Sequence, residues 1–321
     1  SLRQPGSSFK PYVYAAAMSA GLYKPTTIVT DRPVCIGNWC PQNYGHSYSG
    51  SVPLYVALAK SINTIPVQMS IAIGRATGET HEARAAAIGR KKIVATARAM
   101  GLTTPLTDTV SLPIGAAEVT VIDQAAGYAV FANGGKRAKP YAAIDITNSQ
   151  GELIYSHARD EPEPQQVLST QVVQDMNFML SKVPTEGTGR RAALDGIVAA
   201  GKSGTTNGYK DAWYVGYTGN LVEAIWFGND DSSETANLTG GSLPAMTFKE
   251  VMQFAHQGLE LKPIPGVPAD PKAAAVAKAG GATRDPLGAG TPGAGHMPRQ
   301  SFEVLSAGGS MFKTIEPSRS A

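Results

Sequence analysis

A serine and a lysine near the start of the chain, Ser7 and Lys10, form the motif S-x-x-K. If a helix begins at Ser7, Lys10 lies three residues further along and on the same face. A neutral amine beside a hydroxyl can accept its proton, and burial together with neighbouring cations lowers a lysine pKa enough for that. The motif therefore predicts a nucleophilic serine with a lysine general base. A helix cap followed by a solvated lysine is the alternative, and a second match, Ser310 to Lys313, shows that the motif alone is weak.

Two further motifs follow in order along the chain. Ser61-Ile62-Asn63 is its only S-x-N, and Lys202-Ser203-Gly204 is its only K-[ST]-G. Taken singly, Ser61 and Asn63 fit a helix cap or turn as well as they fit a catalytic role, and Lys202 fits an edge strand. The ordered trio, however, is the motif set of penicillin-binding proteins and class A β-lactamases. We therefore expect the three motifs to form one site.

The hydrophobic pattern predicts the elements that position these motifs. Helices are expected at 9–20, 52–73, 83–100, 119–132, 167–181 and 248–259, with residues 61–64 interrupting the second. A hairpin is expected from 141–147 and 152–155, and three strands at 197–206, 212–218 and 221–229, separated by Asn-Gly and Gly-Asn. Residues 23–50 are rich in Gly, Pro, Asn and Tyr and are expected to be loop. Helices before a terminal strand meander predict an α+β fold with an antiparallel sheet.

Composition sets the domain organisation. Residues 1–261 are expected to form one domain, and 262–321, rich in Pro, Gly and Ala, a disordered tail. The net charge of +3 on 321 residues is too small to indicate nucleic-acid binding. No apolar run is long enough to span a bilayer. Cys35 and Cys40 exclude a disulfide-rich scaffold, and the choice between one disulfide and two free thiols stays open.

Two phosphate-binding patterns are judged to be coincidental. Residues 196–203 match the P-loop consensus, but Ile-Val-Ala-Ala reads as strand rather than flexible loop and no helix follows. Residues 288–293 match G-x-G-x-x-G within the tail, without a preceding strand. The five histidines lack metal-ligand spacing. We therefore predict neither a cofactor nor a metal site, and a P-loop nucleotide-binding protein is the least favoured alternative.

The sequence around the motifs resembles the transpeptidase domain of class A, bifunctional penicillin-binding proteins. The resemblance lies in the segments RQPGSSFKP, ALAKSINT, GAAEVTVIDQAAGYAVFANGG, GKSGTTNGYKDAWYVGYTGN and LTGGSLPAMTFKEVM, and it covers residues 1–261. It implies the β-lactamase/transpeptidase-like fold with a helical subdomain. It also implies a periplasmic serine DD-transpeptidase that cross-links peptidoglycan stem peptides and is acylated by β-lactams.

The resemblance also implies residue roles. Ser7 would attack the penultimate D-Ala carbonyl, Lys10 would be the general base, and Ser61 would relay a proton to the leaving amine. Lys202 would keep the site cationic. The expected substrate-binding residues are Asn63, Ser203, Gly204, Thr205 and Thr206, with the Ser7 and Thr205 backbone N–H groups forming the oxyanion hole.

The sequence departs from this family at two points. Its third motif is K-S-G instead of the usual K-T-G, which still supplies a hydroxyl. Only six residues precede Ser7, so two N-terminal strands of the family fold are expected to be missing, together with a glycosyltransferase domain and a membrane anchor of the parent protein.

Two rival functions share this fold. A β-lactamase needs a second base for deacylation, and no E-x-x-L-N-type segment lies between Ser61 and Lys202. A β-lactam sensor or inactive scaffold would use the same pocket without cross-linking peptides.

Overall fold

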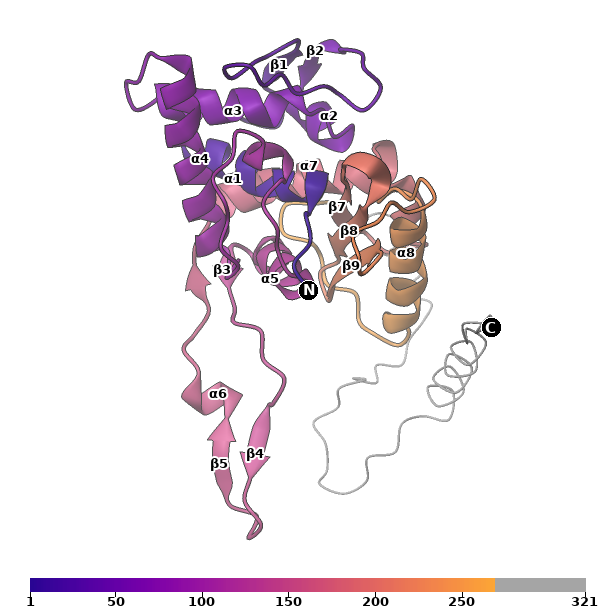
Figure 1. Ribbon diagram of the computed structural model, residues 1–321. Coiled ribbons are helices and arrows are strands. Elements are labelled where there is room, and N and C mark those ends of the chain that lie inside the picture. The colour runs from indigo at the N-terminus through magenta and orange to yellow at the C-terminus, as the bar shows by residue number, and fades with distance from the viewer. Residues whose placement is uncertain (269–321) are drawn as a thin grey trace, which may run out of the picture. The chain divides into compact units, whose positions relative to one another are not determined.

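The computed structural model describes residues 1–268 and contains a three-stranded antiparallel sheet with helices on both faces (Figure 1). The strands are β7 (Ala200–Thr205), β8 (Asp211–Tyr217) and β9 (Val222–Gly228), in that order. Lys202 pairs with Val215 in the middle of β7. The strand expected at 197–206 is therefore confirmed from Ala200 on, whereas residues 197–199 lie outside it. After Lys202 and Ser203 the chain continues as strand to Thr205, where a phosphate-binding loop would lead into a helix.

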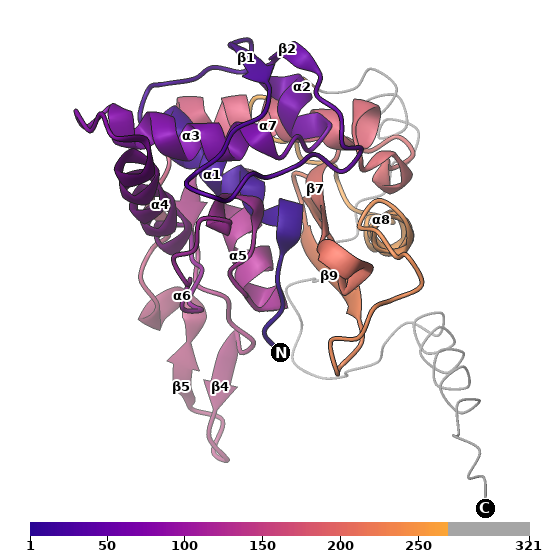
Figure 2. The ribbon, with the colours of Figure 1, turned by 45° about the horizontal axis from the view of Figure 1, so that its top comes forward.

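Successive side chains of β8 point to opposite faces of the sheet. All of them are buried, so both faces must be covered. Trp213, Val215 and Tyr217 join the main hydrophobic core with the central helices. Tyr214 instead packs against Phe248 of α8 (Leu243–Ala255) on the other face. Figure 2 shows α8 beside the sheet, away from the helices that form the main core.

The first long helix, α1 (Lys10–Ser19), is buried along its whole length except at Ser19. It follows a 3-10 turn, η1 (Gly6–Phe9), and contacts the helices α3 (Thr64–Arg75), α4 (Glu82–Ala99) and α7 (Thr170–Glu186). A helix that is apolar on every side must lie in the interior. The expected helix at 9–20 is therefore the centre of the domain, with Lys10 at its first position.

The expected helix over 52–73 is divided by a turn. Pro53 ends strand β2 (Gly50–Pro53), and helix α2 (Leu54–Ala59) follows it. The chain then turns at Ser61, whose φ of 59° is in the left-handed region, before α3 begins. Strand β2 pairs with β1 (Ile28–Asp31). The expectation of loop throughout 23–50 was wrong at β1, because tertiary pairing orders this short strand.

The remaining helices agree with their sequence patterns, with shifts at the ends. Helix α5 (Val121–Ala132) is capped by the Thr120 hydroxyl, and α8 begins five residues before the expected 248–259. The sequence did not predict the short elements η2 (Leu112–Ile114), η3 (Arg190–Ala192) and η4 (Asn207–Tyr209). Helix α7 extends five residues beyond the expected 167–181, in spite of Pro184. Cys35 and Cys40 form a disulfide, which settles the choice that the sequence left open.

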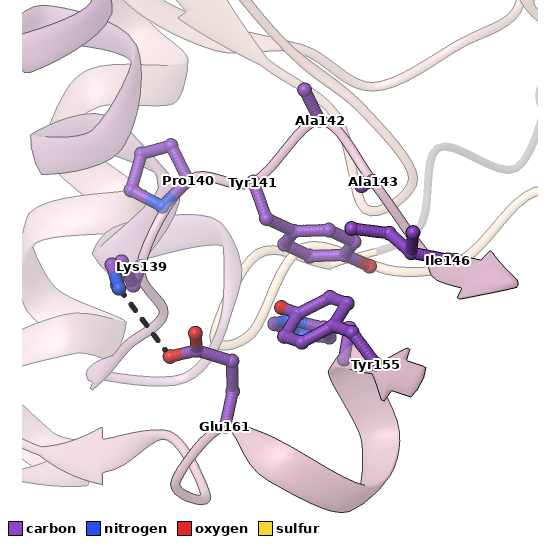
Figure 3. A pocket seen from close by; sticks show the side chains of 9 residues that line it. Lys139, Pro140, Tyr141, Ala142, Ala143, Ile146, Tyr155 and Glu161 are labelled. Atoms are coloured by element: carbon purple, nitrogen blue, oxygen red, sulfur yellow. Dashed lines mark hydrogen bonds and ion pairs between the residues drawn. The ribbon is translucent and has the colours of Figure 1, made fainter. Parts of the chain in front are cut away.

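The expected hairpin at 141–155 forms an arm that projects from the domain (Figure 1). Its strands are β4 (Asp145–Thr147) and β5 (Leu153–Ser156), followed by α6 (His157–Asp160), and β3 (Lys136–Arg137) pairs with β6 (Gln165–Gln166) at its base. A pocket in this arm is lined by Tyr141, Tyr155 and Glu161 among others (Figure 3). The Tyr141 and His157 rings stack with centroids 3.5 Å apart. None of the motif residues lines this pocket.

The chain stays in contact with the domain beyond the expected boundary at residue 261. Ile264 is only 2% exposed within the main core, and the Pro265 carbonyl accepts a hydrogen bond from Asn177 Nδ2 at 2.9 Å. The domain thus extends at least to these residues, because Ile264, three residues past the boundary, is buried in the main core. The rest of the expected tail, 269–321, lies outside the described residues. None of the helices in residues 1–268 combines the length and apolar character needed to cross a bilayer.

Candidate active site

Ser7 lies in the 3-10 turn η1, and its neighbours fix that turn against β7. Ser8 points inward, where its Oγ donates to the Pro5 carbonyl and accepts from Gln124 Nε2, both at 2.8 Å. Gly6 has a φ of 52°, and a Cβ there would come within 2.6 Å of the Thr205 carbonyl oxygen. Ser7, half-buried, therefore sits where the N-terminal turn and the end of β7 are in backbone contact.

Lys10 is completely buried, and its ammonium group is directed at the turn between α2 and α3. Nζ donates to the Ser61 carbonyl and to Asn63 Oδ1, both at 2.6 Å, and lies 3.2 Å from the Ile62 carbonyl and from Ser61 Oγ. Within residues 1–268 it makes no hydrogen bond to Ser7. Burial, followed by the charge of Lys202, holds the pKa of Lys10 well below its usual value.

Lys202 approaches the same turn from the sheet. Its Nζ donates to Ser61 Oγ at 2.9 Å and to the Ser203 carbonyl at 3.0 Å. Burial lowers the pKa of Lys202 to about 7. Ser61 Oγ thus contacts two buried lysines, and none of the side chains that hydrogen-bond to either lysine in the described residues is a carboxylate. The site is a pair of amines without a counter-ion, so an anion entering it would be attracted.

The predicted substrate-binding hydroxyls lie along β7 and just after it. Ser203 Oγ is 2.6 Å from Thr188 Oγ1, and Thr205 Oγ1 accepts a hydrogen bond from the Gly240 N–H at 3.0 Å. Thr206 Oγ1 instead accepts from the Asp211 N–H at 2.9 Å and donates to Asp211 Oδ2 at 3.2 Å. Its hydroxyl is thus engaged on both sides within the turn between β7 and β8.

The sequence did not predict the residues that hydrogen-bond to Asn63 from the neighbouring loop. The Asn63 N–H donates to Asn43 Oδ1 at 2.8 Å, and Asn63 Nδ2 donates to the Gln42 carbonyl at 2.7 Å. Thr188, which contacts Ser203, was missed as well. No spacing rule identifies them, because they come from loops and reach the site only through the tertiary fold.

Residues 1–253 match the family model described as "Transpeptidase: Penicillin binding protein transpeptidase domain". The chain belongs to the penicillin-binding protein transpeptidase family. The resemblance that the motifs suggested is therefore confirmed at the level of the family.

Individual relatives are penicillin-binding proteins as well. The chain is 31% identical over 277 residues to penicillin-binding protein 1A of Neisseria flavescens and 33% identical over 250 residues to that of Aquifex aeolicus. These matches cover 82% and 76% of this chain but 32% of each relative, so the chain spans about a third of their length.

A solved penicillin-binding protein shares the fold. The structure of PonA1 from Mycobacterium tuberculosis superposes with a TM-score of 0.73, covering 92% of this chain and 77% of that one, at 22% identity. At this identity the match supports the expected transpeptidase fold and not the individual residue roles. In this transpeptidase chain, the hydrogen bonds join Lys10, Ser61, Asn63 and Lys202 directly, whereas Ser7 is linked to them through the turn that precedes α1.

Proposed function

We propose that this chain is a serine DD-transpeptidase domain, which cross-links peptidoglycan stem peptides through an acyl-enzyme at Ser7. The observation that carries the proposal is the position of Ser61 Oγ, which lies 3.2 Å from Lys10 Nζ and 2.9 Å from Lys202 Nζ. One hydroxyl thereby connects residues of all three motifs. With pKa values lowered by burial, one amine can be neutral and the other charged at the same pH.

Acylation begins when Ser7 Oγ attacks the carbonyl carbon of the penultimate D-Ala. The Ser7 proton passes to neutral Lys10 Nζ as the O–C bond forms. The carbonyl electrons move onto its oxygen, which the N–H groups of Ser7 and Thr205 stabilise. This step requires Lys10 to move closer to Ser7, in keeping with catalytic hydrogen bonds that tighten only in substrate complexes.

Collapse of the tetrahedral intermediate breaks the C–N bond to the terminal D-Ala. The leaving amine takes a proton from Ser61 Oγ, which is replaced by the proton held on Lys10, so that Lys10 becomes neutral again. The amine of a second stem peptide then attacks the ester. A new C–N bond forms, the O–C bond breaks, and the amine proton returns to Ser7 Oγ by the same path in reverse.

We assign substrate binding to the surrounding side chains. Charged Lys202 attracts the terminal carboxylate, the Ser203 and Thr205 hydroxyls donate to it, and the Asn63 amide bonds the substrate backbone. The small Gly204 allows the turn at Pro5 to approach β7. Because the Thr206 hydroxyl is already bonded to Asp211, we assign Thr206 to holding the end of β7.

Incubation with benzylpenicillin followed by mass spectrometry tests the nucleophile. We expect a single adduct on the peptide that contains Ser7, and none in Ser7→Ala. Ser310→Ala, which removes the other S-x-x-K serine, is the matched control and should be labelled like the wild type. An adduct that persists in Ser7→Ala would refute the assignment.

The lifetime of the adduct separates the rival activities. A β-lactamase needs a base that activates water. Within the described residues, no carboxylate hydrogen-bonds to Lys10, Ser61 or Lys202. We therefore expect a long-lived adduct. A sensor would also give a stable adduct, so cross-linking of lipid-linked peptidoglycan precursors distinguishes it: the transpeptidase forms dimeric stem peptides, whereas a sensor forms none.

We also propose a periplasmic location within a longer parent protein that carries a glycosyltransferase domain and a membrane anchor. The Cys35–Cys40 disulfide supports an oxidising compartment. The length of the penicillin-binding protein 1A relatives supports additional domains. Alkylation of free thiols in the native protein before and after reduction tests the disulfide: two thiols should react only after reduction.

A further inference from the structure

The loop that contains Gln42 and Asn43 contacts the second motif from the side opposite Lys10. Asn63 Oδ1 accepts from Lys10 Nζ at 2.6 Å, while Asn63 Nδ2 donates to the Gln42 carbonyl at 2.7 Å. A flipped Asn63 amide would place its NH₂ against the ammonium and its oxygen against a carbonyl. Its orientation is therefore enforced from both ends.

Asn43 holds this arrangement in place. Its Oδ1 accepts from the backbone N–H of Asn63 at 2.8 Å, and its Nδ2 donates to the Ser47 carbonyl and to both oxygens of Asp31, at 2.9, 2.9 and 3.0 Å. Because Gln42 precedes Asn43 directly, anchoring Asn43 also fixes the carbonyl that holds the Asn63 amide.

Asp31 is the buried end of this chain of hydrogen bonds. Its carboxylate is 2% exposed and accepts from the Ser49 N–H at 2.7 Å and from Thr64 Oγ1 at 2.6 Å, in addition to Asn43 Nδ2. Its oxygens only accept, so they dictate which end of the Asn43 amide faces them. No cation neutralises Asp31 within the described residues, and the two asparagines separate it from Lys10.

We infer that Asn43, oriented by Asp31, is a positioning residue for the transpeptidase site that sets the direction of the Asn63 amide and thereby the environment of Lys10. This inference rests on the proposed function. It explains how Lys10 receives a fixed acceptor without a carboxylate at its side, which would keep the amine protonated. Among the described residues, Lys202 is the charged group that acts on Lys10, and it lowers the pKa of Lys10.

The inference predicts a change in both rate and titration. Without Asn43 the Asn63 amide is free to turn, and Lys10 loses an acceptor that favours its charged form. The pKa of Lys10 should then fall further, and the acid limb of the acylation profile should move to lower pH. Since Asn63 is also displaced from the substrate, the second-order rate constant of benzylpenicillin acylation at neutral pH should fall by about ten- to a hundredfold.

The experiment compares the full-length wild type with Asn43→Ala and Ser47→Ala. Ser47 lies on the same loop, and its side chain makes no hydrogen bond within the described residues, so Ser47→Ala is the matched control and should keep the wild-type rate and profile. A wild-type rate and profile in Asn43→Ala would overturn the inference, as would a loss confined to melting temperature.

Exchanging the acid and the amide between positions 31 and 43 distinguishes a lost hydrogen bond from simple misfolding. Asn43→Asp places a second carboxylate beside Asp31 and should be impaired, whereas the double variant Asp31→Asn with Asn43→Asp restores one donor and one acceptor at this contact. The double variant should acylate faster than Asn43→Asp alone; an equal or slower rate would overturn the inference.

A titration without substrate separates this inference from the proposed function. In ¹³C-lysine-labelled protein, the NMR titration of Lys10 should shift to lower pH in Asn43→Ala and not in Ser47→Ala. An unacylated wild type would refute the proposed function alone, whereas an unchanged Lys10 titration in Asn43→Ala would refute the positioning role alone.

Discussion

Lys10 and Lys202, one at the start of a helix and the other on a strand, hydrogen-bond to the same oxygen, Ser61 Oγ. Both are fully buried, and each is therefore easier to deprotonate than a lysine in water. The two have different proposed tasks, since Lys10 must be neutral to accept a proton and Lys202 must be charged to attract a carboxylate.

The acylation rate constant of the free enzyme should show a bell-shaped dependence on pH. The rate should rise as Lys10 loses its proton and fall above about pH 7, where Lys202 loses its charge. In Lys202→Arg the guanidinium stays charged, so the falling limb should move to higher pH even though the maximum is lower. Stopped-flow acylation with a chromogenic cephalosporin between pH 5 and pH 10 measures both profiles, and identical falling limbs would contradict the assignment of Lys202.

Lys10→Ala should slow penicillin acylation by at least about a hundredfold at neutral pH, the usual scale for a general base. Part of the loss should return at high pH, where hydroxide replaces the missing amine. Lys60→Ala, which removes an exposed lysine next to the Ser61 turn, serves as the control and should acylate normally. If Lys10→Ala kept the wild-type rate, Lys10 would be a structural residue only.

The disulfide should stabilise the loop that leads to Asn43. Cys35 and Cys40 close a short loop two residues before Gln42, and a cross-link of that length contributes on the order of 2 kcal/mol in the chain-entropy model. The Cys35→Ala, Cys40→Ala double variant should therefore melt at a lower temperature and acylate more slowly. Calorimetry with and without reductant provides the measurement. A melting temperature insensitive to reductant in the wild type would show that the cross-link carries no stability.

Truncation should locate the end of the domain. A chain ending at residue 268 should keep the melting temperature of the full chain, whereas one ending at 261 should be less stable. The second truncation removes Ile264, whose burial is worth about 1.5–3 kcal/mol, and it leaves Asn177 Nδ2 without the Pro265 carbonyl. Thermal unfolding of the two chains tests this directly. Equal melting temperatures would place the boundary at 261, as the composition suggested.

The sequence predicted those parts of the fold that depend on local periodicity. The apolar run after Lys10 is a helix, and the run through Lys202 is a strand, because in each the pattern and the burial agree. The turn at Ser61 was visible only as an interruption, since its left-handed φ depends on the packing of α2 and α3. Asn43 could not be identified, because a loop asparagine has many possible partners and only the tertiary fold brings it to Asn63.

The contact between the N-terminal turn and β7 also limits which mutations the chain can tolerate. A Cβ at Gly6 would strike the Thr205 carbonyl, and one at Gly204 would strike the Pro5 carbonyl and crowd Ser8 Oγ. Every single-base change in a glycine codon that yields a different amino acid adds a Cβ. A missense mutation in either codon should therefore displace the turn that carries Ser7. If β-lactams acylate Ser7 as proposed, heritable changes in the response to them should accumulate in side chains around the turn, where substitution leaves the backbone contact intact.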